Sequence, residues 1–210
     1  MKQIIFFIVA IFILSCVFAT DEITIMNNGG ISFSESVSNH QTAKSVYELN
    51  TMQEQNQRIL NLELENLNED EKTIYENQNK IKQASYSLLS MEYLLPSVGI
   101  IVSDIAIQLN NSVQTTIILE KEIISRNSVL RFLVGSDIHS IGELESNLNA
   151  NKERISELKD LNSRCGCSSE IQKIFTEQIE IIESEQNRLQ EIINSEKSST
   201  GLFGSIFRKL

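Results

Sequence analysis

An apolar residue recurs at every seventh position between residues 46 and 95. After Val46 and the polar Gln53, this row contains Leu60, Leu67, Ile74, Ile81, Leu88 and Leu95. A heptad row sustained over this length predicts a coiled-coil helix that lays one edge against a partner. The second heptad row, which includes Asn56 and Asn77, is polar in its middle, so the apolar edge is narrow. We therefore expect an exposed interaction stripe formed by Leu60, Leu67, Ile74, Ile81 and Leu88.

The same region predicts an unusually long helix. Neither Gly nor Pro occurs from Ile31 to Leu95, and Ser38 with Gln41 forms a capping box at its start. An uninterrupted helix over 39–95 would be about 85 Å long. Pro96 ends or kinks it. We expect residues 39–134 to form long coiled-coil helices with a break near Pro96.

Residues 98–134 are the most apolar part of the chain after the N-terminal segment. Two heptad rows run along them, and further isoleucines widen the apolar face. The rows are Val102, Leu109, Thr116, Ile123, Leu130 and Ile105, Ser112, Leu119, Arg126, Leu133, and the isoleucines are Ile100, Ile101, Ile107, Ile117, Ile118 and Ile124. This breadth predicts a central helix covered on more than one side. Glu92, Pro96 and Asp104 oppose the alternative of a membrane span over 88–109.

Two shorter helices follow, after Gly135. Apolar residues at helical spacing occur over 141–163 and again from Ile171 to Ile193, and Cys165-Gly166-Cys167 separates the two runs. Ser140 with Glu143 and Ser169 with Gln172 are capping boxes. Similar lengths and a short linker predict an antiparallel helical hairpin over 139–197.

The N-terminal residues 1–19 have the layout of an export signal. Lys2 precedes the charge-free run from Ile4 to Ala19, and acids follow at once. The run is shorter than the roughly 20 residues of a membrane span, so a cleaved signal peptide is expected, with a retained signal anchor as the alternative. Both place the rest of the chain outside the cytoplasm, secreted or anchored through 4–19. A third alternative is lipidation at Cys16, because the residues before it resemble a lipobox.

Two other segments differ from the helical body. Residues 20–38 form a lead-in, where short β-prone runs flank Asn27-Asn28-Gly29-Gly30 and indicate a β-hairpin over 22–34 or a flexible connection. Residues 198–210 form an amphipathic tail, which ends in Arg208 and Lys209. On a helix its apolar side chains share one face, and they predict either a weak membrane anchor or a plug on the end of the bundle. These side chains are Leu202, Phe203, Ile206 and Phe207.

The amino-acid composition limits which sites and partners we expect. The chain has two His, three Cys and no Trp, and its net charge is −10. An acidic surface makes nucleic acid an unexpected partner. We expect no catalytic residues, no metal site and no cofactor. Cys165 and Cys167 form a candidate disulfide, either within the chain or between two chains. The acids around Glu63–Glu71 are interpreted as a solvated helix face.

Together these patterns predict an all-α protein, either an elongated coiled coil or an antiparallel helical bundle, behind a signal peptide or anchor. The expected function is non-enzymatic: an exported, envelope-associated scaffold, tether or assembly partner. Its expected partners are a second copy or another coiled-coil protein, with membrane contact at the two termini. The alternative is a helical bundle that binds a small molecule or an ion near residues 98–134.

Overall fold

In a computed structural model, residues 41–65, 67–126 and 137–198 are described, and within these ranges the chain is helical without strands. The elements are α2 (Val46–Glu63), α3 (Glu69–Ser90), the 3₁₀ turn η3 (Glu92–Leu94), α4 (Gly99–Ser125), α6 (Ile138–Arg164) and α7 (Ser169–Ser198). The predicted all-α class is therefore confirmed for these residues. The expected export signal, the β-hairpin at 22–34 and the C-terminal tail lie outside them. The chain divides into units 1–39 and 40–210, and all of these helices belong to the second unit.

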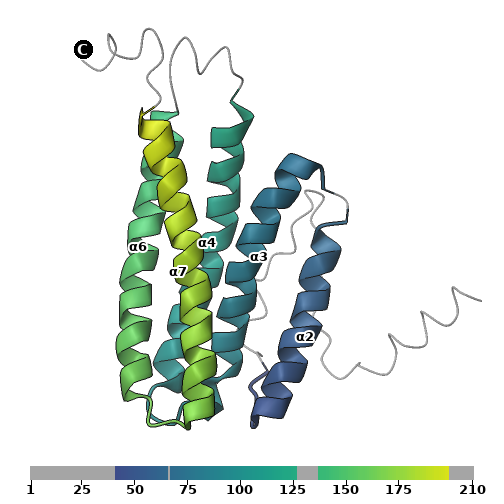
Figure 1. The fold of residues 1–210 in the computed structure, drawn as a ribbon, viewed down its shortest axis with the longest axis vertical. Helices are drawn as coiled ribbons and strands as arrows, with labels where there is room; N and C mark the ends of the chain where they lie inside the picture. The colour runs from purple at the N-terminus through teal and green to yellow at the C-terminus, as the bar shows by residue number, and fades with distance from the viewer. Residues whose placement is uncertain (1–40, 66, 127–136, 199–210) are drawn as a thin grey trace, which may run out of the picture. The chain divides into compact units, whose positions relative to one another are not determined.

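Four helices form a bundle in which each packs against two neighbours. α3 lies between α4 and α7, and α6 lies between the same two helices on the other side. α2 packs along α3, outside this ring of four (Figure 1). Consecutive helices run in opposite directions (Figure 1). This is the arrangement that short connections between amphipathic helices favour.

The prediction of one helix over 39–95 is wrong, because the chain folds back between Glu63 and Glu69. Asn68 starts α3: its side-chain oxygen accepts a hydrogen bond from the Glu71 amide at 2.9 Å. Short amide side chains compete for backbone hydrogen bonds in this way and favour helix starts over helix interiors. α2 begins after Ser45, whose hydroxyl accepts from the Glu48 amide at 3.2 Å. The single rod of about 85 Å is thus replaced by helices of about 27 and 33 Å.

The interaction stripe is not exposed, which corrects a second expectation. Ile74, Ile81 and Leu88 are buried members of the large core, Leu60 is fully buried and Leu67 is half-buried against that core. The stripe is covered within the chain, because α2, α4 and α7 all pack against α3. The polar second heptad row takes part in the contact between α2 and α3: the side-chain amide of Asn56 donates to Gln83 Oε1 at 2.7 Å.

The break near Pro96 is a tight corner between Ser90 and Gly99. A Cβ on Gly99 would lie 2.0 Å from the carbonyl oxygen of Glu92, so only glycine fits there. The Ser97 hydroxyl donates to the Cys165 carbonyl at 2.9 Å and ties this corner to the end of α6.

The helices α6 and α7 pack against each other and are joined by residues 165–168. α6 begins earlier than expected, because Asp137 rather than Ser140 caps it and accepts from the His139 and Ser140 amides. Gly166 has a φ of 60°, a left-handed conformation that glycine adopts without strain. None of the helices in the described ranges combines the length and the apolar character that crossing a membrane would require.

Candidate functional site

A layer of polar side chains crosses the bundle between two apolar clusters. On α4, α6 and α7, the large core lies on one side of this layer and a small core on the other. The small core consists of Leu119, Ile123, Ile141, Leu144, Leu148, Leu189 and Ile193. We call the following residues the polar layer: Gln78, Ser112, Thr116, Glu120, Asn147, Asn151, Glu185, Gln186 and Arg188. All four helices of the bundle contribute to it.

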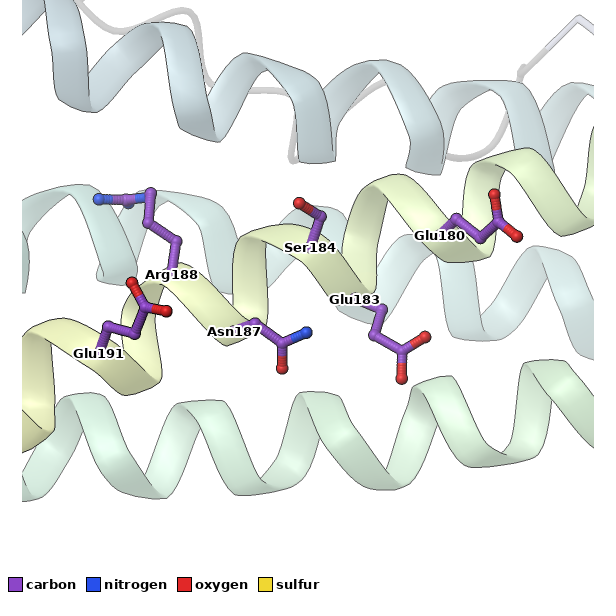
Figure 2. Close-up of a pocket in the computed structure, with 6 residues that line it drawn as sticks. All are labelled: Glu180, Glu183, Ser184, Asn187, Arg188 and Glu191. Atoms are coloured by element: carbon purple, nitrogen blue, oxygen red, sulfur yellow. The ribbon is translucent and has the colours of Figure 1, made fainter.

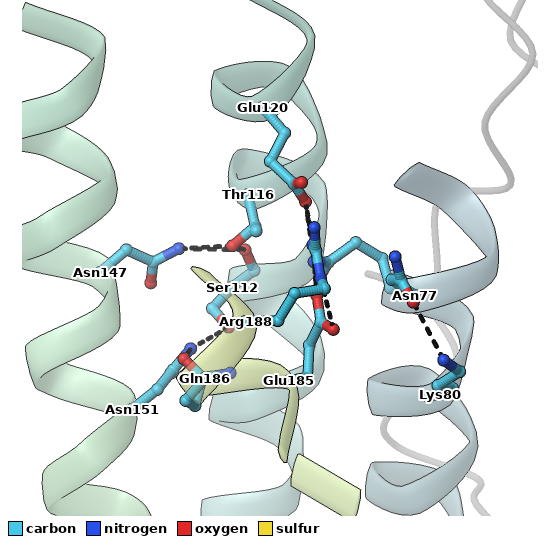
Figure 3. Close-up of polar contacts among 11 residues, drawn as sticks. Asn77, Lys80, Ser112, Thr116, Glu120, Asn147, Asn151, Glu185, Gln186 and Arg188 are labelled. Carbon is cyan, nitrogen blue, oxygen red and sulfur yellow. Dashed lines mark hydrogen bonds and ion pairs between the residues drawn. The ribbon is translucent and has the colours of Figure 1, made fainter. Parts of the chain in front are cut away.

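The charged half of the polar layer joins α3, α4 and α7. The Arg188 guanidinium lies between two carboxylates, donating to Glu120 Oε2 at 2.8 Å and to both oxygens of Glu185 at 2.6 and 2.8 Å (Figure 3). From α3, the Gln78 amide donates to Glu185 Oε1 at 2.8 Å and to Glu120 Oε2 at 3.2 Å. Glu120 is 0% exposed and Glu185 is also buried. These contacts hold two acids in the core against one cation.

Burial changes the proton affinities of Glu185 and Arg188. Loss of hydration raises the pKa of Glu185, and the nearby Glu120 carboxylate adds to the rise, while the hydrogen bond and charge of Arg188 oppose it. For Arg188, burial alone would lower the pKa. Its hydrogen bonds to Glu185 and Glu120 outweigh that effect and raise the pKa above its ordinary value. The guanidinium therefore stays charged, while the pKa of Glu185 lies above its ordinary value.

Glu120 has one carboxylate oxygen, Oε1, that is buried without a hydrogen-bond partner among the described residues. A buried acceptor left in this state costs about 1–3 kcal/mol. Its partner oxygen, Oε2, accepts two hydrogen bonds. The unpaired oxygen is therefore the position in the polar layer where an added donor or cation would stabilise the fold most.

The neutral half of the polar layer joins α4, α6 and α7 (Figure 3). The Asn147 amide donates to the Thr116 hydroxyl at 2.8 Å, and the Asn151 amide donates to the Ser112 hydroxyl at 3.1 Å. A longer contact of 3.4 Å joins Asn151 to Gln186. Directional bonds of this kind fix how far each helix can slide along its neighbours.

Spacing along each helix explains why these side chains meet. Ser112, Thr116 and Glu120 follow one another at four-residue intervals on α4, as Asn147 and Asn151 do on α6, so each set shares one face. Sequence analysis did not identify this layer. The available signal was that Thr116 and Ser112 each interrupt one heptad row of the most apolar helix.

A shallow depression of about 430 Å³ lies beside the charged half (Figure 2). Its lining residues, Glu180, Glu183, Ser184, Asn187, Arg188 and Glu191, all belong to α7. A surface made by one helix cannot enclose a drug-sized ligand, which usually has most of its area buried. The lining is mainly acidic, and Glu183 already pairs with Lys159 at 2.7 Å.

The two cysteines of the candidate disulfide are joined within the chain, with a Cα–Cα distance of 5.2 Å. Cys165 is buried at the end of the large core, and Cys167 packs against it. The bridge thus sits in the turn between α6 and α7. No group of three or more His, Cys, Asp or Glu residues suited to a metal ion occurs in the part of the chain that the structure describes.

Large apolar side chains remain exposed on the outer surface of α2 and α4. On α2 they are Tyr47, Ile59 and Leu62, and on α4 they are Ile100, Ile101, Ile118 and Ile124. Ile100 and Ile118 are five helical turns apart and therefore in line, and the half-buried Ile107 lies close to that line. We call Ile100, Ile107 and Ile118 the outer row. The expected cover on more than one side of this helix comes from α3 and α6, which leave the outer row uncovered.

The expected contact residues of the tail, Leu202, Phe203, Ile206 and Phe207, lie outside the described ranges. Comparison of the chain with protein families, curated proteins and solved structures gives no match.

Proposed function

We propose that the chain is a non-enzymatic, exported helical protein that acts as a scaffold, tether or assembly partner. The observation that carries this proposal is the outer row on α4. It lies on the most apolar helix of the described bundle, and Ile118 keeps 48% of its surface exposed. Single exposed apolar side chains are ordinary on protein surfaces, but several in line on one helix are typical of a protein–protein contact.

The surface area of α4 shows how much of a stable interface this helix can supply. Its 27 residues extend for about 40 Å. With a width of about 10 Å, the helix offers roughly 400 Å², whereas a stable interface buries about 800 Å² on each partner. Side chains of the helices beside α4, which are α3 and α6, must therefore take part as well. A second copy of the chain, or another coiled-coil protein, presents an apolar helix face of matching length.

Export rests on the charge-free run from Ile4 to Ala19. A signal that is retained would anchor the bundle at the envelope, and a cleaved one would release it. Fusing residues 1–25 to a reporter that is active only outside the cytoplasm tests this part of the proposal. An inactive reporter, with the fusion present in the cytoplasm, would contradict export.

The contact is tested by sedimentation velocity over a range of protein concentrations. The wild-type chain should associate, and the double variant Ile100→Asp/Ile118→Asp should stay monomeric with unchanged circular dichroism. Gln114→Asp is the matched control, because it adds a charge to the same exposed surface without removing an apolar side chain. Equal association of all three proteins would contradict a role for the outer row.

The second candidate function is binding of an ion or small molecule near residues 98–134. The specific observation in its favour is the unpaired Oε1 of Glu120 on α4. Melting curves with K⁺, Mg²⁺ and Ca²⁺, each added alone, test it. A site at Glu120 predicts that one cation raises the Tm of wild type and leaves that of Glu120→Gln unchanged. Equal responses of the two proteins would exclude this site.

A further inference from the structure

One end of the bundle is built from three helices rather than four. The small core there draws only on α4, α6 and α7. α3 does not extend that far, because its first turn already pairs with α4 through Glu71 and Lys121 at 2.6 Å. Figure 1 shows the end of α4, the start of α6 and the end of α7 extending past α3. We call this the open end.

Apolar side chains are left exposed at the open end. Ile124, in the last turn of α4, is 45% exposed, and Ile138, the first residue of α6, is 67% exposed. Ile192 of α7 packs against the small core but is only half-buried. The three helix ends are held together by polar contacts, so these positions are fixed relative to one another. Ser140 donates to Glu122 at 2.8 Å, and Lys197 bonds Glu145 at 2.6 Å.

The chain itself supplies an apolar segment next to this surface. α7 ends at Ser198, and Leu202 follows four residues later. Four residue steps span at most about 14 Å. Axes of packed helices are about 8–10 Å apart, so Leu202 can reach the end of α6, which packs against α7, and the residues after it can continue toward the end of α4.

From this placement we infer that residues 202–207 of the same chain dock on the open end and cover Ile124 and Ile138. Phe203 and Phe207 are the large side chains of that segment, and each can bury more area than Ile124 or Ile138. Arg208 and Lys209 follow directly. They are complementary in charge to the exposed carboxylates of Glu122 and Glu143 on the helices beside them.

Residues 202–207 are covalently attached to the bundle, which favours them over a second copy of the chain as the segment that covers the open end. A short connection gives the tail an effective concentration of about 1 mM or more, well above that of a separate molecule in dilute solution. This proposal is independent of the outer row, which lies along the length of α4.

A double-mutant cycle in the full-length chain tests the docking. Phe203→Ser/Phe207→Ser should lower the Tm by about 5 °C, and Ile138→Ser should lower it by a smaller amount. Combining them should cost less than the sum, because the same contact is lost in both. Tyr93→Ser is the matched control: it replaces a side chain that is as exposed as Ile138, at the corner before α4, and its effect should add to that of the tail variant.

Two results would overturn the inference. Additive effects of the tail variant and Ile138→Ser would show that other atoms cover Ile138. An unchanged Tm in the tail variant would also exclude docking. If that variant in addition binds less to phosphatidylcholine–phosphatidylserine vesicles, then the tail contacts a membrane instead.

Discussion

Two apolar rows in this chain differ in exposure: one is buried within the chain and the other lies at its surface. The interaction stripe between Leu60 and Leu88 is covered by helices of the same chain, and Ile81 is only 1% exposed. The outer row of α4 remains at the surface, although α4 is the more apolar helix. The stripe is covered because α2, α4 and α7 of the same chain pack against α3. Apolar periodicity thus predicts that a helix face will be covered, while the connections decide which chain covers it.

The polar layer links the helices that carry the two rows, because Gln78 of α3 donates a hydrogen bond to Glu120 of α4. Buried polar groups of this kind cost stability compared with apolar packing, but they penalise every arrangement in which their bonds are not made. The bonds from Asn147 to Thr116 and from Asn151 to Ser112 form together in the observed register. We interpret the polar layer as the feature that fixes how far α4, α6 and α7 slide past one another.

A charge placed in each row should give the largest contrast. Ile81→Asp buries an unpaired carboxylate in the large core and should cost at least about 4 kcal/mol, a large part of the roughly 5–15 kcal/mol that stabilises a typical domain. Ile118→Asp should change stability by about 0.5 kcal/mol or less. Urea denaturation followed by circular dichroism measures both. Similar costs for the two variants would contradict their different burial.

Removing the cation of the polar layer should have the next largest effect. Arg188→Met leaves Glu120 and Glu185 in the core without their partner and should cost about 3 kcal/mol. The triple variant Glu120→Leu/Glu185→Leu/Arg188→Met removes all three charges and should recover most of that loss. Lys152→Met, at an exposed hydrogen bond to Gln190, is the control and should be nearly neutral. A triple variant as unstable as Arg188→Met would show that the charges themselves stabilise the fold.

The pH dependence should follow from Glu185. Because burial raises its pKa in the folded state above the ordinary value of about 4.5, the folded protein binds this proton more tightly than the unfolded chain does. Stability from this group is therefore greatest at low pH and is lost as the pH rises through the raised pKa. Glu185→Gln should gain stability relative to wild type over that window. A difference that stays constant from about pH 4 to pH 8 would contradict the assignment.

The smallest effect should come from the bridge between α6 and α7. A disulfide that closes a loop of three residues restricts the unfolded chain little and contributes about 1–2 kcal/mol. Cys165→Ser/Cys167→Ser should lower stability by that amount and speed amide exchange near Gly166. Exchange in the small core at the opposite end of α6 should not change. Faster exchange there would mean that the bridge controls the whole hairpin.

The sequence allowed the helical class, the corner at Pro96 and the turn at Cys165–Cys167 to be located. The fold-back after Glu63 was missed because Leu67 continues the heptad row and neither Gly nor Pro occurs between Glu63 and Glu69. Asn68 caps a new helix here only because the packing of α2 against α3 stabilises the turn between them. The helix preferences of single residues and the heptad spacing are therefore compatible with one long helix and with two shorter helices.

The polar layer was harder to predict for a different reason. Glu120 and Arg188 are 68 residues apart, and nothing in the spacing of either residue indicates the other. A carboxylate on a helix face is usually solvated, so the sequence favours that interpretation for Glu120 and Glu185 alike. Only the packing of α7 against α3, with Arg188 reaching across to α4, brings the three charges together.

Cysteine labelling of the two rows tests the central claim most directly. Ile81→Cys and Ile118→Cys would each be treated with a maleimide under native conditions, in dilute and in concentrated protein, and the labelled site identified by mass spectrometry. The account predicts that Ile81→Cys is protected at every concentration, while Ile118→Cys reacts in dilute protein and becomes protected as the chains associate. Labelling of Ile81→Cys in dilute protein, with protection only on association, would contradict it and make the stripe the interface.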